Sequence, residues 1–328
     1  METFEPAKRE VLNAIEPIVE ANLDLLVDMN AKKWWPSDFF SWMETPDYHE
    51  PLAELRREAE GLGPGILASI VGNTITEEAL PNYGARLATL FPDPTGIVER
   101  PWNQWSRGWT AEEDMHGRVL NDYLMLTGRV NMEAVDKTIF GLLKGGFEQD
   151  ADLYKGVLYP MFQEVATMVS HVNTGKIAKS ENADTMATMC RSIAGDEARH
   201  ARFYFAAGKA LFEIDPEGAL KSWHALMKDG IIMPALYMTD GETPAPNLYN
   251  NFASIAQEVG VYTPMDYADI LRDFNDRLGV ADLRINGESG REQEYLARLP
   301  DRIEKIGAYR MSKKREPVPL SWLNGVKV

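Results

Sequence analysis

Cysteine is almost absent from this chain, since Cys190 is the only one among 328 residues. A single thiol excludes a disulfide framework, and it also excludes an iron–sulfur cluster held by the chain's own cysteines. Any redox chemistry carried out by this chain therefore needs electrons from elsewhere.

Long apolar runs and basic residues are also scarce. No apolar stretch is long enough to span a bilayer, and the first residues are acidic and amphipathic, without an apolar segment of signal-peptide length. We therefore expect a cytoplasmic protein that does not insert into membranes. Lysine and arginine total 34 against 50 acidic residues, a net charge of -16. This balance argues against nucleic acid as a partner, because phosphate contacts need a basic surface.

The patterns that are present are helical. Apolar residues recur every three or four positions, no run of alternating strands occurs, and no Gly/Ser-rich or Pro-rich linker divides the metal-binding region proposed below. The sequence predicts a single all-α domain over residues 1–328, with at most one short hairpin in the Pro-rich C-terminal tail. Residues 7–29 are predicted to form one helix, with Val11, Ile15, Val19 and Leu23 on one side.

One helical pattern carries the chemistry. Glu113 and His116 lie three residues apart on a predicted helix, and a second Glu-x-x-His pair follows 84 residues later. Residues three apart share one helix face, and both faces are otherwise apolar. A single glutamate precedes each pair, by 36 residues in the first copy and by 33 in the second. The six residues of this repeated pattern are Glu77, Glu113, His116, Glu164, Glu197 and His200.

This repeat is the ligand set of a di-iron or di-manganese carboxylate bundle, in which two helices supply one Glu each and two supply a Glu-x-x-His pair. Four ionised glutamates in an apolar bundle repel one another, and two divalent cations bring their charge to zero. Nitrogen and oxygen ligands without a thiolate favour iron or manganese over structural zinc. We expect two iron ions, with manganese as the alternative, in a four-helix core over about residues 65–210.

Three neighbours of the predicted ligands have specific expectations. Pro81 lacks the N–H that would bond the Glu77 carbonyl, so the helix should kink beside this glutamate. Thr167, one turn after Glu164, either bonds back to the helix backbone, which its spacing favours, or presents its hydroxyl to bound oxygen. His171 is either next to a ligand or a packed core histidine.

The residues just before the two Glu-x-x-His pairs, Glu112 and Asp196, are both acidic. A metal-bound histidine usually donates its second N–H to a carboxylate. In a pseudo-symmetric bundle, an acid one step off the ligand face points toward the neighbouring helix. We therefore expect crossed pairs, Asp196 with His116 and Glu112 with His200, and the alternative is that both acids are solvated.

Several longer motifs occur in order along almost the whole chain: WWPSDFF, ITEEALPNY, WTAEEDMHG, FQEVATMVSH, DEARH, GVYTPMDYADIL and PLSWL. In these motifs the chain resembles the soluble acyl-[acyl-carrier-protein] desaturases, the plant stearoyl type and its bacterial relatives. The resemblance implies a ferritin-like di-iron bundle with additional helices, in which the same six residues bind two irons. It also implies that Thr167 faces the oxygen site, and that Trp34, Trp109 and Asp196 surround the metals.

The resemblance further implies an enzyme of fatty acid biosynthesis that uses oxygen and two electrons to introduce a double bond into a saturated acyl chain on acyl carrier protein. Ferredoxin would be the electron donor, and the enzyme would be a homodimer. Lys32 and Lys33 are either an ordinary solvated turn or part of a basic patch that docks the acidic carrier. The residues that match the family's cavity stretches, and so would line a substrate tunnel, are Leu87, Thr89, Gly156 and Tyr249.

Three other functions fit parts of this pattern: an oxygenase that hydroxylates a carrier-bound acyl group, a ferritin-like ferroxidase, and a non-enzymatic helical scaffold. The long segment after His200 argues against a ferroxidase, which usually has a shorter chain. The complete ligand set argues against a scaffold.

Overall fold

The computed structural model describes residues 6–31, 34–148, 152–283, 285, 288–313 and 315–328. Its α-helices are α1 (Pro6–Ala14), α2 (Glu16–Glu20), α3 (His49–Glu60), α4 (Pro64–Glu77), α5 (Leu80–Leu90), α6 (Pro101–Thr127), α7 (Met132–Gly145), α8 (Lys155–Ser180), α9 (Asp184–Ile214), α10 (Pro216–Asp229), α11 (Asn247–Val259), α12 (Pro264–Arg277) and α13 (Glu288–Met311). Short 3-10 helices are η1 (Leu23–Leu25), η2 (Pro36–Glu44), η3 (Pro234–Tyr237), η4 (Val280–Asp282) and η5 (Ser321–Leu323). No strand forms among the described residues, which confirms the all-α prediction.

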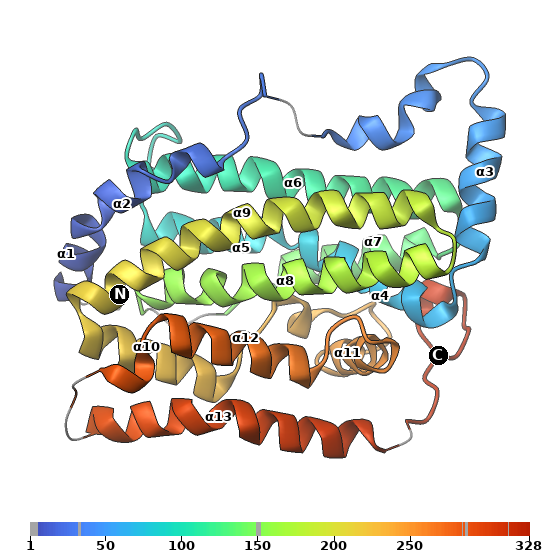
Figure 1. Cartoon of the computed structure of the whole chain (residues 1–328). Helices are drawn as coiled ribbons and strands as arrows, with labels where there is room; N and C mark the ends of the chain where they lie inside the picture. The colour runs from blue at the N-terminus through green and yellow to red at the C-terminus, as the bar shows by residue number, and fades with distance from the viewer. Residues whose placement is uncertain (1–5, 32–33, 149–151, 284, 286–287, 314) are drawn as a thin grey trace.

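The long helices α6, α8 and α9 lie side by side, and α8 and α9 pack against each other along most of their lengths (Figure 1). Helix α4 packs on α6 and α8, which completes a four-helix core. Helices α10 and α12 pack on α8, α13 packs on the outer side of α10 and α12, and α11 covers α4 (Figure 1). None of the described helices is both long enough and apolar enough to cross a lipid bilayer.

The first and last residues of helix α6 explain where this core helix starts and stops. It begins with Pro101 in its first turn, where the missing N–H of proline costs nothing, and it ends at Gly128, whose φ of 65° is left-handed. Its 27 residues extend about 40 Å. Trp109, Leu120 and Leu124 on the inner face are buried, so the middle of the helix is held in the core.

The kink predicted beside Glu77 is present. Helix α4 ends at Glu77, and α5 begins at Leu80 with Pro81 in its first turn. Pro160 has a smaller effect, because α8 continues through it from Lys155 to Ser180.

The prediction of one helix over residues 7–29 is wrong. The structure has α1, α2 and η1 in this segment, and Ile15 separates α1 from α2. Pro17 explains the break, because proline lacks the N–H that a continuous helix would use and disfavours helical geometry in the residue before it. Ile15 and Val19 are nonetheless buried, so the apolar face was assigned correctly.

The C-terminal tail forms a single antiparallel bridge, between Pro319 and Lys327, in place of the hairpin that the sequence allowed. Val318 and Val328 exchange backbone hydrogen bonds of 2.9 and 3.0 Å. The ladder stays this short because proline cannot donate a strand hydrogen bond.

Candidate metal centre

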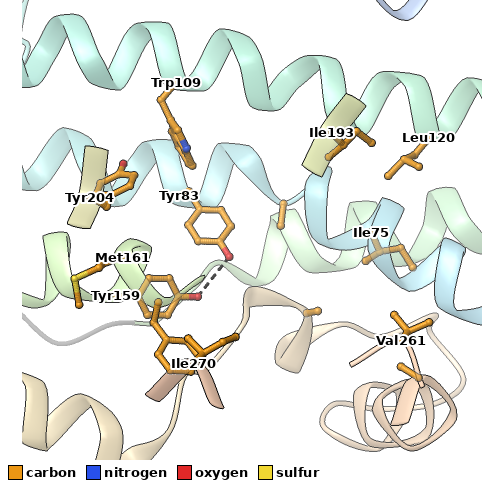
Figure 2. Close-up of a cluster of buried hydrophobic side chains, with 14 of the residues drawn as sticks. Ile75, Tyr83, Trp109, Leu120, Tyr159, Met161, Ile193, Tyr204, Val261 and Ile270 are labelled. Atoms are coloured by element: carbon orange, nitrogen blue, oxygen red, sulfur yellow. Dashed lines mark hydrogen bonds between the residues drawn. The ribbon is translucent and has the colours of Figure 1, made fainter. Parts of the chain in front are cut away.

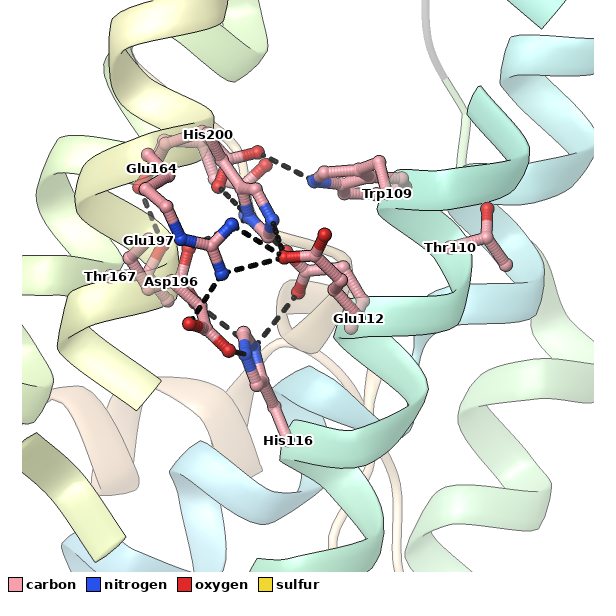
Figure 3. Close-up of polar contacts among 12 residues, drawn as sticks. Trp109, Thr110, Glu112, His116, Glu164, Thr167, Asp196, Glu197 and His200 are labelled. Carbon is pink, nitrogen blue, oxygen red and sulfur yellow. Dashed lines mark hydrogen bonds and ion pairs between the residues drawn. The ribbon is translucent and has the colours of Figure 1, made fainter. Parts of the chain in front are cut away.

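The six residues of the repeated Glu and His pattern converge in the middle of the four-helix core, and Figure 3 shows Glu164, Glu197 and both histidines turned toward one another. All six side chains are buried. They form two overlapping groups, in each of which the ligand atoms lie within 4.8 Å of one another. The first group is Glu77, Glu113, His116 and Glu197, and the second is Glu113, Glu164, Glu197 and His200. Glu113 and Glu197 belong to both groups.

The Nδ1 atoms of both histidines face the carboxylates. His116 Nδ1 lies 3.4 Å from Glu113 Oε2 and 3.5 Å from Glu197 Oε1. His200 Nδ1 lies 2.9 Å from Glu113 Oε1 and 3.5 Å from Glu164 Oε2. The Glu-x-x-His spacing therefore places one carboxylate and one imidazole nitrogen of each pair on the same inner face of α6 and α9.

The atoms that face the middle of this cluster test whether it fits metal ions. Those that make no hydrogen bond within the described part of the chain are Glu113 Oε1, His116 Nδ1, Glu164 Oε2, Glu197 Oε1, Glu197 Oε2 and His200 Nδ1. A buried polar atom without a partner costs about 1–3 kcal/mol, so a cluster of them indicates a ligand. Four carboxylates, two imidazoles and no sulfur fit a pair of divalent cations such as iron or manganese. Each ion would have its own Glu and His, and both would share Glu113 and Glu197.

Burial and neighbouring charges move the pKa values of these glutamates apart. Burial raises the pKa of Glu197 well above its ordinary value, and the charge of Glu113 adds to the effect. Burial also raises the pKa of Glu164. Burial acts in the same direction on Glu113, but the charges of His116 and His200, whose Nδ1 atoms lie close to its carboxylate, outweigh it and lower the pKa. A bound cation would favour the carboxylate form of all of these residues.

The second nitrogen of each histidine meets an acid from the neighbouring helix (Figure 3). His116 Nε2 lies 3.5 Å from Asp196 Oδ2, and His200 Nε2 lies 3.1 Å from Glu112 Oε2. These are the crossed pairs that the sequence predicts. Both acids are buried, so they are not solvated helix residues. A proton on Nε2 shared with the acid leaves Nδ1 available as a ligand.

The sequence interpretation missed Arg199, a buried residue that joins the two crossed pairs. Its two terminal nitrogens donate to Glu112 Oε2 at 2.9 and 2.8 Å, and one of them also donates to Asp196 Oδ1. The guanidinium also donates to the Leu25 carbonyl at 2.7 Å, which ties the N-terminal segment to the centre. The one sequence signal was the position of this arginine between two predicted ligands in the DEARH motif.

Two tryptophans border the cluster. Trp34 Nε1 donates to Asp196 Oδ2 at 3.0 Å, and Trp109 Nε1 donates to Glu164 Oε1 at 3.1 Å. The Trp34 ring also stacks on His116, with centroids 6.0 Å apart and ring planes at 13°. Trp34, Asp196 and His116 therefore form a continuous set of contacts leading outward from the centre.

A family model described as fatty acid desaturase matches residues 7–324. The chain belongs to the fatty acid desaturase family. The sequence is 39% identical over 330 residues to the chloroplastic stearoyl-[acyl-carrier-protein] 9-desaturase of Olea europaea, covering 98% of this chain and 84% of the relative. It is also 39% identical over 331 residues to stearoyl-[acyl-carrier-protein] 9-desaturase 1 of Arabidopsis thaliana, with the same coverage of 98% and 84%.

A solved structure shares the fold of this desaturase-family chain. The X-ray structure of DesA2 from Mycobacterium tuberculosis H37Rv superimposes with a TM-score of 0.53 and covers 84% of this chain and 97% of its own. At 18% sequence identity this likeness speaks for the helical architecture alone.

The structure also places the two residues whose roles the sequence left open. His171 Nε2 lies 2.9 Å from Glu77 Oε1, so this buried histidine contacts a predicted ligand. Thr167 Oγ1 donates to the Gln163 carbonyl at 2.6 Å, which is the backbone bond that its spacing favours. Thr167 also lines a cavity that Glu77 lines as well.

This cavity has a volume of about 490 Å³ and lies on the Glu77 side of the cluster. Helices α4 and α8 form one wall, and residues of α11, α12 and α13 form the other. Much of the lining is apolar or aromatic, including Phe162, Met233, Tyr249, Phe252, Val261 and Ile303. The cavity is large enough for part of an extended apolar ligand.

The four predicted tunnel residues do not line one cavity. Tyr249 lines the large cavity, whereas Leu87 and Gly156 line a separate pocket of about 20 Å³. Thr89 is exposed, and its hydroxyl donates to the Arg86 carbonyl at 2.7 Å. Leu87 and Thr89 cannot share a lining, because residues two apart on a helix point in different directions.

The small pocket is closed by packed side chains. A Cβ at Gly156 would lie 2.1 Å from Leu90 Cδ1, so this glycine meets a neighbouring side chain and not open space. Tyr83 and Tyr159 form another part of the wall, and Figure 2 shows their hydroxyls, 3.4 Å apart, directed toward each other. A long acyl chain could enter this pocket only if these side chains moved.

Lys32 and Lys33, the predicted docking pair for the carrier, lie outside the described residues. Their role stays a prediction.

Proposed function

We propose that this chain is an oxygen-dependent, di-iron acyl-[acyl-carrier-protein] desaturase. The reaction would remove two hydrogens from a saturated acyl chain and give a double bond and water. One observation carries the proposal: two groups of four potential metal ligands share Glu113 and Glu197, and they lie next to a mainly apolar cavity. The relatives named stearoyl-[acyl-carrier-protein] 9-desaturases support the substrate class.

The residues would divide the metal ions between them as the two groups suggest. Glu77 and His116 would hold one iron, Glu164 and His200 the other, and Glu113 and Glu197 both. Bound iron together with dioxygen would oxidise an unactivated C–H bond, a reaction that no side-chain acid or base can carry out. The buried acids Asp196 and Glu112 orient the imidazoles through Nε2, so that Nδ1 stays directed at the metal position.

The cavity supplies the positioning that such a reaction needs. Its apolar walls would hold the acyl chain extended beside Glu77 and Thr167, and they would keep water away from the reacting carbons. Helices α11, α12 and α13 form its far wall. A ferritin-like ferroxidase oxidises iron ions and needs no apolar cavity for an acyl chain. The presence of this wall therefore favours the desaturase over the ferroxidase.

We further propose ferredoxin as the electron donor, because the chain has one cysteine and cannot build an iron–sulfur cluster alone. The contacts of Trp34 with Asp196, and of Asp196 with His116, are the proposed route to the centre. Family resemblance also leads us to propose a homodimer, which light scattering of the purified protein tests.

The decisive experiment is product analysis by mass spectrometry. The protein is incubated with ferrous iron, ferredoxin, its reductase and acyl carrier proteins loaded with saturated chains of several lengths. A product lighter by two hydrogen atoms supports desaturation, whereas a product heavier by one oxygen atom means hydroxylation. Unchanged substrate from iron-loaded, reducible protein would contradict both. Metal analysis of the same protein separates iron from manganese.

A further inference from the structure

Helix α13 carries three exposed arginines in one row, Arg291, Arg298 and Arg302. Their spacings of seven and four residues place them on one face of the helix. Tyr295 and Leu299 lie in the same row. Together with Glu294, these five residues line a surface groove of about 330 Å³. We call the three arginines the α13 arginine row.

The groove adjoins the large cavity beside the metal centre. Tyr295 and Leu299 line both of them. Among the described residues that line the cavity, Lys228 and Asp229 at the end of α10 are exposed, so they mark where it reaches the surface. Helix α10 packs directly on α13. The arginine row therefore borders the mouth of the proposed acyl cavity.

The acids of α13 mostly face its neighbours. Asp301 and Glu304 pair with Arg272 of α12, at 3.3 and 2.8 Å. Glu292 approaches His224 of α10 at 3.7 Å. These acids are thus turned toward α12 and α10, and they do not neutralise the arginine row.

Only one arginine of the row, Arg298, has an acidic partner among the described residues. Glu294 pairs with Arg298 at 2.6 Å, and this is a solvent-exposed pair that contributes little. Arg291 and Arg302 form no ion pair with any residue that the structure describes. The groove therefore carries net positive charge on a chain whose net charge is -16.

We propose that the α13 arginine row docks the acidic acyl carrier protein, so that the attached acyl chain passes Tyr295 and Leu299 into the cavity. This inference rests on the proposed function. A carrier that holds its acyl chain covalently must sit at the cavity mouth, and arginine binds carboxylate and phosphate groups with two parallel hydrogen bonds. Repulsion from the rest of the acidic chain is screened over about 8 Å at physiological salt, so the local row determines the contact.

The position of the row also separates the two protein partners. The N-terminal segments α2 and η2, which flank Trp34, lie on the opposite side of the core from α13 (Figure 1). An electron donor at Trp34 and a carrier at α13 would therefore not compete. Both could be bound during one turnover. The α13 row is in this respect an alternative to the predicted pair Lys32 and Lys33, which directly precede Trp34 in the sequence.

The test compares two variants with the same change of net charge. The row variant is Arg291→Glu, Arg298→Glu and Arg302→Glu together. The control variant is Lys137→Glu, Lys176→Glu and Lys209→Glu, three exposed lysines on α7, α8 and α9. Fluorescence anisotropy of labelled acyl carrier protein gives the Kd of each iron-loaded protein at low and physiological salt. Ferredoxin-driven reduction of the centre is measured in parallel.

We expect the row variant to raise the Kd about tenfold or more and the control variant less than about twofold, because only close charges contribute strongly. The salt dependence of the Kd should weaken in the row variant alone. Both variants should be reduced by ferredoxin at the wild-type rate. If the glutamate row variant does not fold, Arg→Gln at the same three positions makes the same comparison with a smaller expected change.

Equal Kd values in the row and control variants would overturn the docking surface, since net charge alone would then explain binding. A row variant that binds like the wild type would overturn it as well. In both cases a wild type that binds and desaturates the acyl chain leaves the proposed function intact. A wild type that binds no acyl carrier protein would overturn the docking surface and the proposed function together.

Discussion

Each predicted ligand histidine is held from outside the centre by an acid of a different helix, and Arg199 joins those two acids. Burial alone would raise the pKa of Asp196, but the hydrogen bond and charge of His116, with the charge of Arg199, lower it. Burial acts on Glu112 in the same way, and its hydrogen bonds with His200 and Arg199 help to lower the pKa. Both acids therefore stay ionised at neutral pH and can orient the imidazoles.

The contact between Trp34 and Asp196 gives Asp196 a role that Glu112 does not share. Asp196→Asn should keep most of the iron while slowing reduction by ferredoxin about tenfold, since outer carboxylate partners typically affect activity by 10–100-fold. Iron content by metal analysis and stopped-flow reduction measure the two effects separately.

Glu112→Gln is the matched control for that variant, because it removes the same charge from the other crossed pair, whose acid accepts no hydrogen bond from a tryptophan of the described chain. Its reduction rate should stay closer to the wild type. Equal slowing in both variants would mean that Trp34 is not part of the electron route.

Arg199 should be a large contributor to stability. Arg199→Gln leaves Glu112 and Asp196 buried with fewer partners, and breaking a buried ion pair costs about 3–5 kcal/mol. Urea unfolding should show a loss of roughly that size. Arg202→Gln, on the exposed side of the same helix, should change the free energy of unfolding by no more than about 0.5 kcal/mol. Similar values for the two variants would contradict the bridging role.

At the scale of the helices, α4 and α11 are brought together at a glycine. A Cβ at Gly72 would lie 2.0 Å from the ring of Phe252, which also lines the large cavity. Only glycine allows this approach without moving the ring. The packing of α11 on α4 therefore shapes one wall of the proposed acyl site.

Gly72→Ala should accordingly lower the free energy of unfolding by about 1–3 kcal/mol, the usual cost of overpacking. It should also raise KM for acyl-carrier substrate, because the displaced Phe252 ring narrows the cavity. Gly84→Ala on α5 is the control, since a Cβ there meets nothing within 4 Å. That change should stabilise the helix by about 0.5–1 kcal/mol. A stabilising Gly72→Ala variant would contradict the predicted close contact.

At the scale of the whole molecule, the metal ions should hold the four-helix core together. Four buried glutamates repel one another when ionised, and bound cations remove that repulsion. A ligand present at a hundred times its Kd stabilises the folded state by about 2.7 kcal/mol. For a chain of 328 residues, the loss of one ion bound at that level should lower Tm by about 4 °C, and the loss of two by more.

Scanning calorimetry with and without a chelator tests this prediction. The variant Glu113→Gln, which alters one of the two shared ligands, should show a much smaller difference between the two conditions. An identical Tm for the wild type in both conditions would mean that the cluster does not bind metal tightly in the folded protein.

The arrangement of the predicted ligands followed from local geometry. A helix repeats every 3.6 residues, so the Glu-x-x-His spacing already places Glu113 beside His116 and Glu197 beside His200. The tunnel prediction rested on family likeness instead, and it grouped Leu87 with Thr89 although helix spacing divides them. Periodicity alone also predicted one helix over residues 7–29, because the effect of Pro17 was overlooked.

The sequence by itself determined the helical class, the six predicted ligands and the crossed pairs of acid and histidine, because each depends on periodicity along single helices or on charge balance. Only the tertiary structure revealed the bridge made by Arg199, the separation of Tyr249 from Leu87 and Gly156, and the α13 arginine row at the cavity mouth. These features depend on which faces of distant helices meet. That is set by side-chain packing over the whole core, and no local spacing records it.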